Sequence, residues 1–305
     1  MTSSVVKVLL TGCNGQVGWE YCERASEFDT MSVVATDVHN LDITDQEAVR
    51  AMIEREQVDV VVNAAAYTAV DKAESEEALA QAVNVTGPEY LSTESNRAGI
   101  PILHISTDYV FDGNTTTPYT EGDRPSPASV YGRTKLAGED VVHRCNPRAI
   151  TLRTSWVFGR VGGNFVRTMV RLAGEQNELR VVADQFGSPT YAGDLADALL
   201  SLTLRCVQDA GTPWGLYHYC GQGPTTWYAF ASRIIDEACS LGIVDQKPVV
   251  KPIRTDEFET AAERPGYAVL NCTHLDRTFP DIGLPSWETG LTDVLNAIAE
   301  GASER

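Results

Sequence analysis

The chain has 305 residues, of which 43% are hydrophobic and 22% are charged, and its formal net charge is −18 at pH 7. This composition is typical of a globular protein that is long enough for one large domain or two closely packed units. The acidic balance excludes a broad basic surface, so we expect neither a nucleic-acid partner nor a membrane partner.

The cysteines and histidines give no sign of a metal site or a disulfide framework. The seven cysteines are scattered without a C-x-x-C pair, and the five histidines form no ligand cluster. Such cysteines are typical of thiols in a reducing compartment. The first ten residues, MTSSVVKVLL, hold too short an apolar run for a signal peptide, and no segment has 18 consecutive apolar residues. We therefore expect a cytoplasmic protein without a structural metal.

Short apolar runs alternate with helical patterns through the first two-thirds of the chain. The runs are rich in β-branched residues and nearly continuously apolar, as in strands that are covered on both faces. After the second run, Ala48, Met52 and Ile53 form a helical apolar stripe, and Thr44 and Glu47 predict a capping box. This alternation predicts an α/β fold with a doubly wound, Rossmann-like parallel sheet. The predicted strands cover residues 5–10, 32–36, 58–63, 102–106, 149–155 and 215–220.

The pattern changes after Trp156. A glycine-rich stretch follows, then the loop DQFGSPT, a helical pattern over 192–207, and a final third with more prolines and shorter elements. A closing helix is predicted from Trp287 towards Glu300. We therefore predict a dinucleotide-binding domain and a smaller C-terminal substrate-binding lobe. The domain would comprise residues 1–155 and 181–221, and the lobe residues 156–180 and 222–305.

The first predicted strand is followed by TGCNGQVG, in which Gly12, Gly15 and Gly18 have the spacing G-x-x-G-x-x-G. A glycine-rich turn between a strand and a helix lets the backbone approach a pyrophosphate at the helix N-terminus. Asp37 ends the second strand and is placed to bind a ribose 2′-hydroxyl, so it favours NADH over NADPH. A tight turn without a ligand and a solvated acidic residue are the alternatives.

After the third strand, Ala66, Tyr67 and Thr68 lie in a segment of mostly small residues, NAAAYTAVDKAE. Small side chains would let a cofactor lie against the backbone. A plain strand-to-helix turn explains the alanines equally well.

The stretch YGRTK places Tyr131 four residues before Lys135 in a predicted helix. Positions i and i+4 share one helix face. Lowering a tyrosine pKa from about 10 to about 7, where it would exchange protons readily, takes about 4 kcal/mol. An ammonium at about 5 Å and an effective dielectric constant of about 20 supplies about 3 kcal/mol. The spacing therefore predicts a proton donor whose pKa the lysine lowers. A surface helix pair is the alternative when the pair is considered alone.

The fourth predicted strand ends in HISTDYVFDG, where Thr107 or Ser106 reaches the carboxyl edge of the sheet. Enzymes of this architecture bind their ligands at that edge. We therefore predict Thr107 as the third catalytic residue. The alternative is a hydroxyl that is satisfied within its own turn.

Together these motifs resemble the extended short-chain dehydrogenase/reductases, and among them the branch that reduces dTDP-4-dehydrorhamnose. The resemblance runs from about residue 5 to residue 270. It is carried by TGCNGQVG, NAAAYTAVDKAE, STDYVFDG, YGRTKLAGE, RTSWVFG, GGNF, DQFGSPT and ERPGYAVL.

The resemblance implies reduction of the 4-keto group of dTDP-4-dehydro-β-L-rhamnose by NADPH or NADH, with the dTDP-sugar as the small-molecule partner. It implies that Tyr131 donates the proton, that Lys135 binds the nicotinamide ribose and lowers the tyrosine pKa, and that Thr107 binds the reacting oxygen. Asp108 and Trp156 would contact the sugar nucleotide. Further residues match cofactor-contacting positions, namely Gly15, Gln16, Val17, Asp37, Asp42, Ile43, Ala66, Tyr67 and Thr68. From their chemistry we add Asn164 and Arg264 as candidates for the substrate diphosphate.

Some members of this branch bind Mg²⁺ at a dimer interface through several glutamates. Glu20 matches one of these positions, but Gly193 and Ala297 stand where the others would be. This departure argues against a Mg²⁺-bridged dimer, while a homodimer of another kind stays a candidate.

Three other functions are weighed against this one. A dehydratase of the same superfamily carries a glutamate after the Thr-Asp pair, whereas this chain has Tyr109. A reductase of another dTDP-4-keto-6-deoxy sugar would share every motif above. A non-catalytic nucleotide-binding subunit is expected to lack Tyr131 or Lys135, and both are present.

Overall fold

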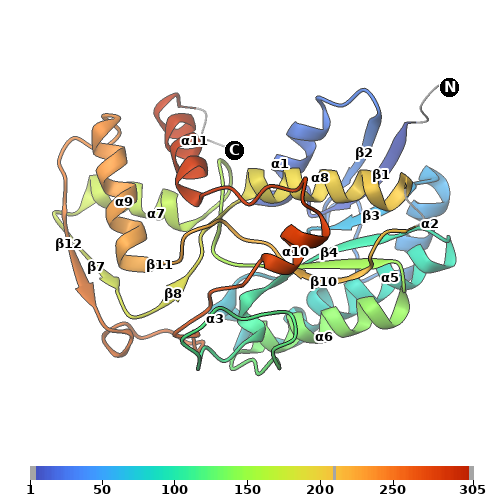
Figure 1. Cartoon of the computed structure of the whole chain (residues 1–305), viewed down its shortest axis with the longest axis horizontal. Helices are drawn as coiled ribbons and strands as arrows, with labels where there is room; N and C mark the ends of the chain where they lie inside the picture. Colours follow the sequence, from blue (N-terminus) through green and yellow to red (C-terminus); the bar gives the residue numbers. More distant parts are fainter. Residues whose placement is uncertain (1–4, 209–210, 302–305) are drawn as a thin grey trace.

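The computed structural model describes residues 5–208 and 211–301. A six-stranded parallel sheet with the order β10-β5-β4-β3-β1-β2 runs through its larger part (Figure 1). The six strands coincide with the six predicted runs, and the predicted fold class is confirmed. The strands are β1 (Val6–Thr11), β2 (Met31–Thr36), β3 (Val60–Asn63), β4 (Ile102–Thr107), β5 (Ala149–Thr154) and β10 (Gly215–His218).

Both faces of this sheet are covered by helices, which explains why its strands are almost wholly apolar. On β1, Val8 and Leu10 pack with the core beneath α1 and α8, and Leu9 packs with the opposite core against α2 and α5. In Figure 1, α8 lies on one side of the sheet and α5 and α6 on the other. These helices are α1 (Gln16–Ala25), α2 (Gln46–Glu56), α5 (Gly87–Arg97), α6 (Val130–Cys145) and α8 (Ala192–Gln208).

Strand β1 lies between β2 and β3, so the chain winds away from it in both directions. In a doubly wound sheet, ligands bind in the crevice that opens at this point, outside the carboxyl ends of the strands. The loops that follow β1, β2, β3, β4 and β5 all begin at that edge. These loops contain the glycine turn, Asp37, Ala66 and Asp108, whereas Tyr131 and Lys135 lie in helix α6.

A second, smaller unit lies at the left of Figure 1 and has an apolar core of its own. Strands β7 and β12 pair in parallel there, beside α7 and α9. The predicted domain boundary at residue 181 falls inside β7. Because β7 pairs with β12 and Val181 packs in this second core, residues 181 and 182 belong with the smaller unit. Its elements are α7 (Phe165–Glu175), β7 (Glu178–Val182), α9 (Trp227–Ser240), β12 (Val249–Ile253) and α11 (Trp287–Ala299).

The predicted closing helix and the helix over 192–207 are confirmed by α11 and α8, but the predicted capping box of α2 is wrong. Asp45 is the N-cap of α2 and accepts a hydrogen bond from the Ala48 amide at 3.1 Å. Thr44 lies one residue before the N-cap, and its hydroxyl donates to Asp42 at 2.7 Å.

The remaining elements are short. None of the helices in the described ranges is long and apolar enough to cross a membrane. The short remaining elements are α3 (Val70–Ala73), α4 (Glu77–Gln81), η1 (Ala82–Thr86), η2 (Asp108–Val110), β6 (Val157–Phe158), β8 (Phe186–Gly187), β9 (Thr190–Tyr191), β11 (Thr225–Thr226), η3 (Thr255–Glu257) and α10 (Thr273–Thr278).

Candidate active site

A cleft of about 590 Å³ follows the carboxyl edge of the sheet and is bounded on its far side by the smaller unit. We call it the main cleft. A second hollow of about 300 Å³ lies over the ends of β1 and β2, and we call it the cofactor hollow. The two share Gly15, Ala64, Ala65 and Ala66, so they form one continuous groove across the switch point of the sheet.

The glycine turn after β1 forms the floor where the two hollows meet. Gly12 has φ +74°, and a Cβ there would lie 2.6 Å from the Ala65 nitrogen. A Cβ on Gly18 would lie 2.1 Å from the Gly12 carbonyl oxygen. Gly15 is the N-cap of α1 and offers no side-chain acceptor, and the first turn of α1 holds no acidic residue. The free amides at this N-terminus therefore suit a pyrophosphate.

Asp37, Asp42 and Ile43 line the cofactor hollow, as the sequence predicts. The Asp37 carboxylate is held in place, since it accepts hydrogen bonds from the Asn14 amide at 3.1 Å and the Val38 amide at 2.8 Å. It is fixed at the rim where a ribose hydroxyl could donate to it.

The other predicted cofactor residues divide into two groups. Gln16, Val17, Ala66 and Thr68 line the main cleft. Tyr67 lines neither hollow, and its phenol donates to Glu76 at 2.5 Å.

Helix α6 brings Tyr131 and Lys135 to the wall of the main cleft. Ser129 caps the helix by accepting from the Gly132 amide at 3.1 Å, so the tyrosine lies in the first turn. Both side chains are buried, with 9% of Tyr131 and 2% of Lys135 exposed. The Lys135 ammonium donates to the Ile105 carbonyl at 2.7 Å.

Burial moves the pKa values of these two groups in opposite directions. Loss of solvent raises the pKa of Tyr131 well above its ordinary value, and a hydrogen bond with Thr107 opposes this only in part. Loss of solvent also lowers the pKa of Lys135 to about 8, against the attraction of Glu139. The predicted lowering of the tyrosine pKa is therefore wrong for the protein alone. Desolvation of the phenol is the largest cause, and the neighbouring Asp108 and Tyr109 raise the pKa further.

Thr107 ends β4 beside the phenol. Its hydroxyl donates to Asp108 at 2.9 Å and accepts from the Tyr109 amide at 3.2 Å. Burial raises the pKa of Asp108 to about 7. The second carboxyl oxygen of Asp108, Oδ2, is buried on the cleft wall without a hydrogen-bond partner in the described structure. An unpaired acceptor at this place suits a ligand hydroxyl.

A buried ion pair supports this end of the cleft from behind. Glu139 lies one turn after Lys135 and receives a bidentate contact from Arg153, at 2.9 and 2.6 Å. It also accepts a hydrogen bond from Ser106. The pair fixes α6 against β4 and β5, and therefore fixes the position of Lys135.

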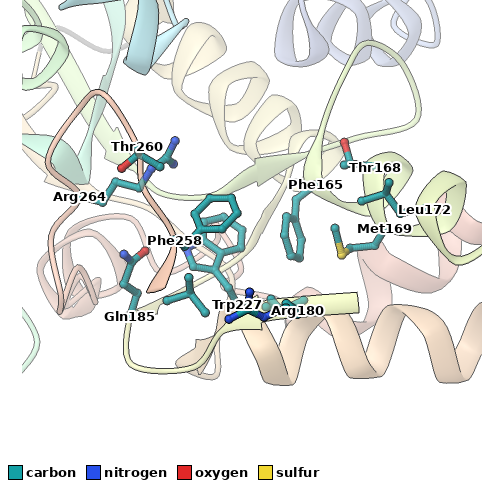
Figure 2. A pocket seen from close by; sticks show the side chains of 12 residues that line it. Phe165, Thr168, Met169, Leu172, Arg180, Gln185, Trp227, Phe258, Thr260 and Arg264 are labelled. Carbon is teal, nitrogen blue, oxygen red and sulfur yellow. The ribbon is translucent and has the colours of Figure 1, made fainter. Parts of the chain in front are cut away.

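Aromatic rings separate the main cleft from a third hollow of about 460 Å³. Trp156 stacks on Trp227 with ring centres 3.5 Å apart. Phe165 packs against the same Trp227 with ring centres 4.6 Å apart. Trp156 has φ +46°, an uncommon conformation for a residue with a side chain. Figure 2 shows Phe165, Trp227 and Phe258 projecting into the third hollow, with Gln185 at its edge.

Asn164 and Arg264 both line the main cleft, but their contacts differ from those expected. The Asn164 amide is fully used by the protein. It donates to Gln16 at 3.0 Å and to the Gly159 carbonyl at 2.9 Å, and it accepts from the Arg167 amide at 3.1 Å. It therefore orients Gln16 and leaves Arg264 as the better diphosphate candidate.

Glu20 is buried and already paired. Arg160 donates to both of its carboxyl oxygens, at 2.9 and 2.7 Å, and the Tyr191 hydroxyl lies at 3.3 Å. At Gly193 a side chain would strike Arg24 and Tyr191. Within the described ranges no three His, Cys, Asp or Glu side chains come together as a metal site. Arg160 therefore pairs with Glu20, the carboxylate whose position the resemblance relates to Mg²⁺.

The cleft residues that were not foreseen from the sequence include Asp71, Tyr109 and Trp227. Trp227 follows Thr226, the N-cap of α9, and the sequence signal that could have found it is a tryptophan directly after two threonines in the segment GQGPTTW. Asp71 lies within NAAAYTAVDKAE, where the alanines drew attention instead. At Tyr109 the sequence shows only that the glutamate of a dehydratase is absent.

Comparison with known proteins gives consistent matches over nearly the whole chain. Residues 6–300 match the family model of the RmlD substrate binding domain. A dTDP-4-dehydrorhamnose reductase of Aggregatibacter actinomycetemcomitans is 39% identical over 290 residues, which cover 95% of this chain and 98% of the relative.

Two solved structures have the same architecture throughout. A dTDP-4-dehydrorhamnose reductase from Clostridium acetobutylicum is 39% identical and superposes with a TM-score of 0.88, covering 96% of this chain and 99% of its own. The reductase from Bacillus anthracis, solved in complex with NADP, is 35% identical with a TM-score of 0.87 and the same coverage.

Proposed function

The chain belongs to the family of the RmlD substrate binding domain, and from this membership and the geometry of the cleft we infer the reaction. It is an oxidoreductase that reduces the 4-keto group of dTDP-4-dehydro-β-L-rhamnose to dTDP-β-L-rhamnose with NADPH or NADH. The observation that carries this inference is the continuous groove. It joins a dinucleotide-type glycine turn to a buried tyrosine, lysine and threonine.

The residues present fit a nicotinamide dinucleotide. Gly12 and Gly18 allow the close backbone approach, the N-terminus of α1 offers free amides, and Asp37 marks the ribose end. Gly15, Gln16, Val17, Asp42, Ile43, Ala66 and Thr68 would line its path. When bound, the nicotinamide supplies the hydride.

Tyr131 is the proton donor in this proposal. Its raised pKa keeps the phenol protonated at neutral pH, which is the form that a reduction needs. The alkoxide that a carbonyl becomes on reduction is a far stronger base than a phenolate, so the proton still moves downhill. Thr107 hydrogen-bonds the reacting oxygen. Lys135 binds the nicotinamide ribose, and its ammonium supplies a positive charge at this end of the cleft.

The sugar nucleotide would lie across the aromatic wall. Asp108 offers its unpaired oxygen to a sugar hydroxyl, Trp156 packs against the sugar, and Arg264 faces the diphosphate. The third hollow, lined by Phe165, Trp227 and other residues of the smaller unit, has the size and apolar character for the nucleoside (Figure 2).

Two rival functions are disfavoured by the same cleft. In a dehydratase, a carboxylate would be needed at Tyr109, but this phenol is bound by Arg264 at 3.3 Å and packs edge-on against Tyr131 at 5.4 Å. A non-catalytic subunit would have no use for a buried lysine at a cleft wall. A reductase of another dTDP-4-keto-6-deoxy sugar is the alternative that the experiment must separate.

The test is to offer the purified protein a panel of dTDP-4-keto-6-deoxy sugars with NADPH or NADH and to follow the loss of reduced-cofactor absorbance. We expect the highest kcat/KM with dTDP-4-dehydro-β-L-rhamnose. Equal or faster turnover of another stereoisomer would reassign the substrate, and no turnover of any of them would overturn the reductase function.

The proposal includes three further parts. Residues 1–155 with residues 183–221 form the dinucleotide-binding domain, and residues 156–182 with residues 222–301 form the substrate lobe, from which Leu275, Phe279 and Ile282 pack into the core of the main sheet. The enzyme acts in the cytoplasm. It forms a homodimer without bridging Mg²⁺, which sedimentation with and without a chelator tests.

A further inference from the structure

The two walls of the main cleft are joined by contacts of Asp71. This residue lies in α3 on the cofactor side, and its carboxylate reaches the segment 262–264 of the substrate lobe. One oxygen accepts from the Ala262 amide at 3.1 Å, and the other accepts from the Arg264 guanidinium at 2.8 Å. The same guanidinium donates to the Tyr109 hydroxyl at 3.3 Å.

The position of each partner gives this contact its meaning. Asp71 comes three residues after Thr68, which lines the main cleft where the cofactor is proposed to lie. Arg264 lines both the main cleft and the third hollow, so it stands where a diphosphate would pass between them. Asp71 therefore connects the segment that touches the cofactor to the arginine that faces the substrate.

We propose that Asp71 is a positioning residue that couples cofactor binding to binding of the substrate diphosphate by presenting Arg264; this inference rests on the proposed function. A free arginine must lose side-chain freedom when it binds a ligand. Here the Arg264 guanidinium already donates hydrogen bonds to Asp71 and Tyr109. The Arg264 side chain is still 27% exposed, which leaves room for hydrogen bonds to a ligand. A cofactor lying against Ala66 and Thr68 restricts the start of α3, and therefore fixes the Asp71 carboxylate.

Such coupling is reciprocal, so each ligand tightens the binding of the other by the same factor. The opposite arrangement is also physically reasonable: a carboxylate that competes with the diphosphate for Arg264 would weaken substrate binding. The two arrangements predict opposite effects of removing the Asp71 charge. One substitution therefore distinguishes them.

The experiment is isothermal titration of dTDP into the full-length protein, with and without saturating NADPH, for the wild type and Asp71→Asn. We expect NADPH to tighten dTDP binding about 5-fold or more in the wild type and to leave it nearly unchanged in D71N. In turnover, we expect KM for the sugar nucleotide to rise about 10-fold in D71N, with kcat within about 3-fold, because the reacting groups are untouched. The Kd for NADPH alone should change less than about 2-fold, since Asp71 acts through the other ligand.

Three controls separate positioning from structural damage. Asp236→Asn removes the acid of an exposed ion pair between Asp236 in α9 and Lys247, and it should leave every value unchanged. Asp71→Glu keeps the charge and should restore part of the coupling. In an Arg264→Ala background, D71N should have no further effect on dTDP affinity.

Tighter dTDP binding in D71N would show competition and overturn the proposal. So would unchanged coupling, a D71N effect that persists without Arg264, or absence of dTDP binding by the wild type. Titration with dTDP needs no turnover, so failure of the reductase assay with intact coupling would reject the proposed reaction and leave the role of Asp71 standing.

Discussion

Replacing Lys135 by methionine separates the free-energy cost of burying its charge from the catalytic use of that charge. Lys135 as a whole is 2% exposed, and burial lowers the pKa of its ammonium from 10.5 to about 8. Folding therefore competes with protonation of this lysine. Methionine has a similar length, no charge and a flexible shape that fills irregular space.

The sign and size follow from the two pKa values. A lysine whose pKa is lower in the folded protein destabilises that protein below the folded pKa, and the penalty disappears as the pH rises from about 8 through 10.5. At pH 7 the penalty amounts to about 3 kcal/mol. The methionine loses the hydrogen bond to the Ile105 carbonyl, which offsets about 1–2 kcal/mol. We expect Lys135→Met to be more stable by about 1–2 kcal/mol at pH 7 and less stable by about 1–2 kcal/mol at pH 10.5.

Urea unfolding followed by tryptophan fluorescence at both pH values measures this change of sign. Lys251→Met is the matched control, because Lys251 is exposed in β12 and pairs with Glu178 on the surface. Turnover is measured on the same samples, and we expect it to fall about 100-fold or more in K135M while stability at pH 7 rises.

A K135M variant that is less stable than the wild type at pH 7 would refute the reasoning. It would mean that the buried ammonium is well compensated by Glu139 and the Ile105 carbonyl, and that its pKa is not lowered. Equal stability differences at both pH values would lead to the same conclusion.

Three further predictions concern the groove. We expect Tyr131→Phe to bind NADPH normally and to lower kcat about 100-fold or more, since only the proton donor is lost; stopped-flow turnover within tenfold of the wild type would remove Tyr131 from this role. We expect the wild type to prefer NADH, and Asp37→Asn to shift the ratio of kcat/KM values towards NADPH by about tenfold, because the carboxylate repels a 2′-phosphate; strong NADPH selectivity of the wild type would contradict this reading. We expect Trp227→Ala to raise KM for the sugar nucleotide about tenfold with little change in NADPH affinity, because Trp156 loses its stacking partner; an unchanged KM would show that Trp156 holds its place alone.

The strands and the fold class could be predicted because the information is local, whereas the order of the strands in the sheet was not predicted. Runs such as VKVLL in β1 place Val8 and Leu10 on one face and Leu9 on the other, and both faces are apolar. Only a parallel sheet covered on two sides needs such strands. The Tyr131 and Lys135 pair was equally local, since spacing along one helix brings both to one face.

Features that depend on distant segments were missed or wrong. Asp71 and Arg264 are 193 residues apart, and no spacing rule joins them. The fine structure of α2 failed for a different reason, because two local rules competed. The Thr44 hydroxyl donates to Asp42, and Asp45 caps the helix by accepting from the Ala48 amide.

The most instructive error is the tyrosine pKa. A pairwise estimate treats the ammonium as the dominant influence, but β4 and the packed helices also remove water from both groups, and desolvation favours the neutral form of each. The phenol thus keeps its proton more firmly and the lysine loses its proton more readily. For alcohol oxidation this arrangement would be poor, since the base must first ionise. For carbonyl reduction it is favourable, because the donor is fully protonated at every pH near neutrality while Lys135 stays mostly charged below about pH 8. Burial of the site therefore keeps Tyr131 in the protonated form that a reduction needs.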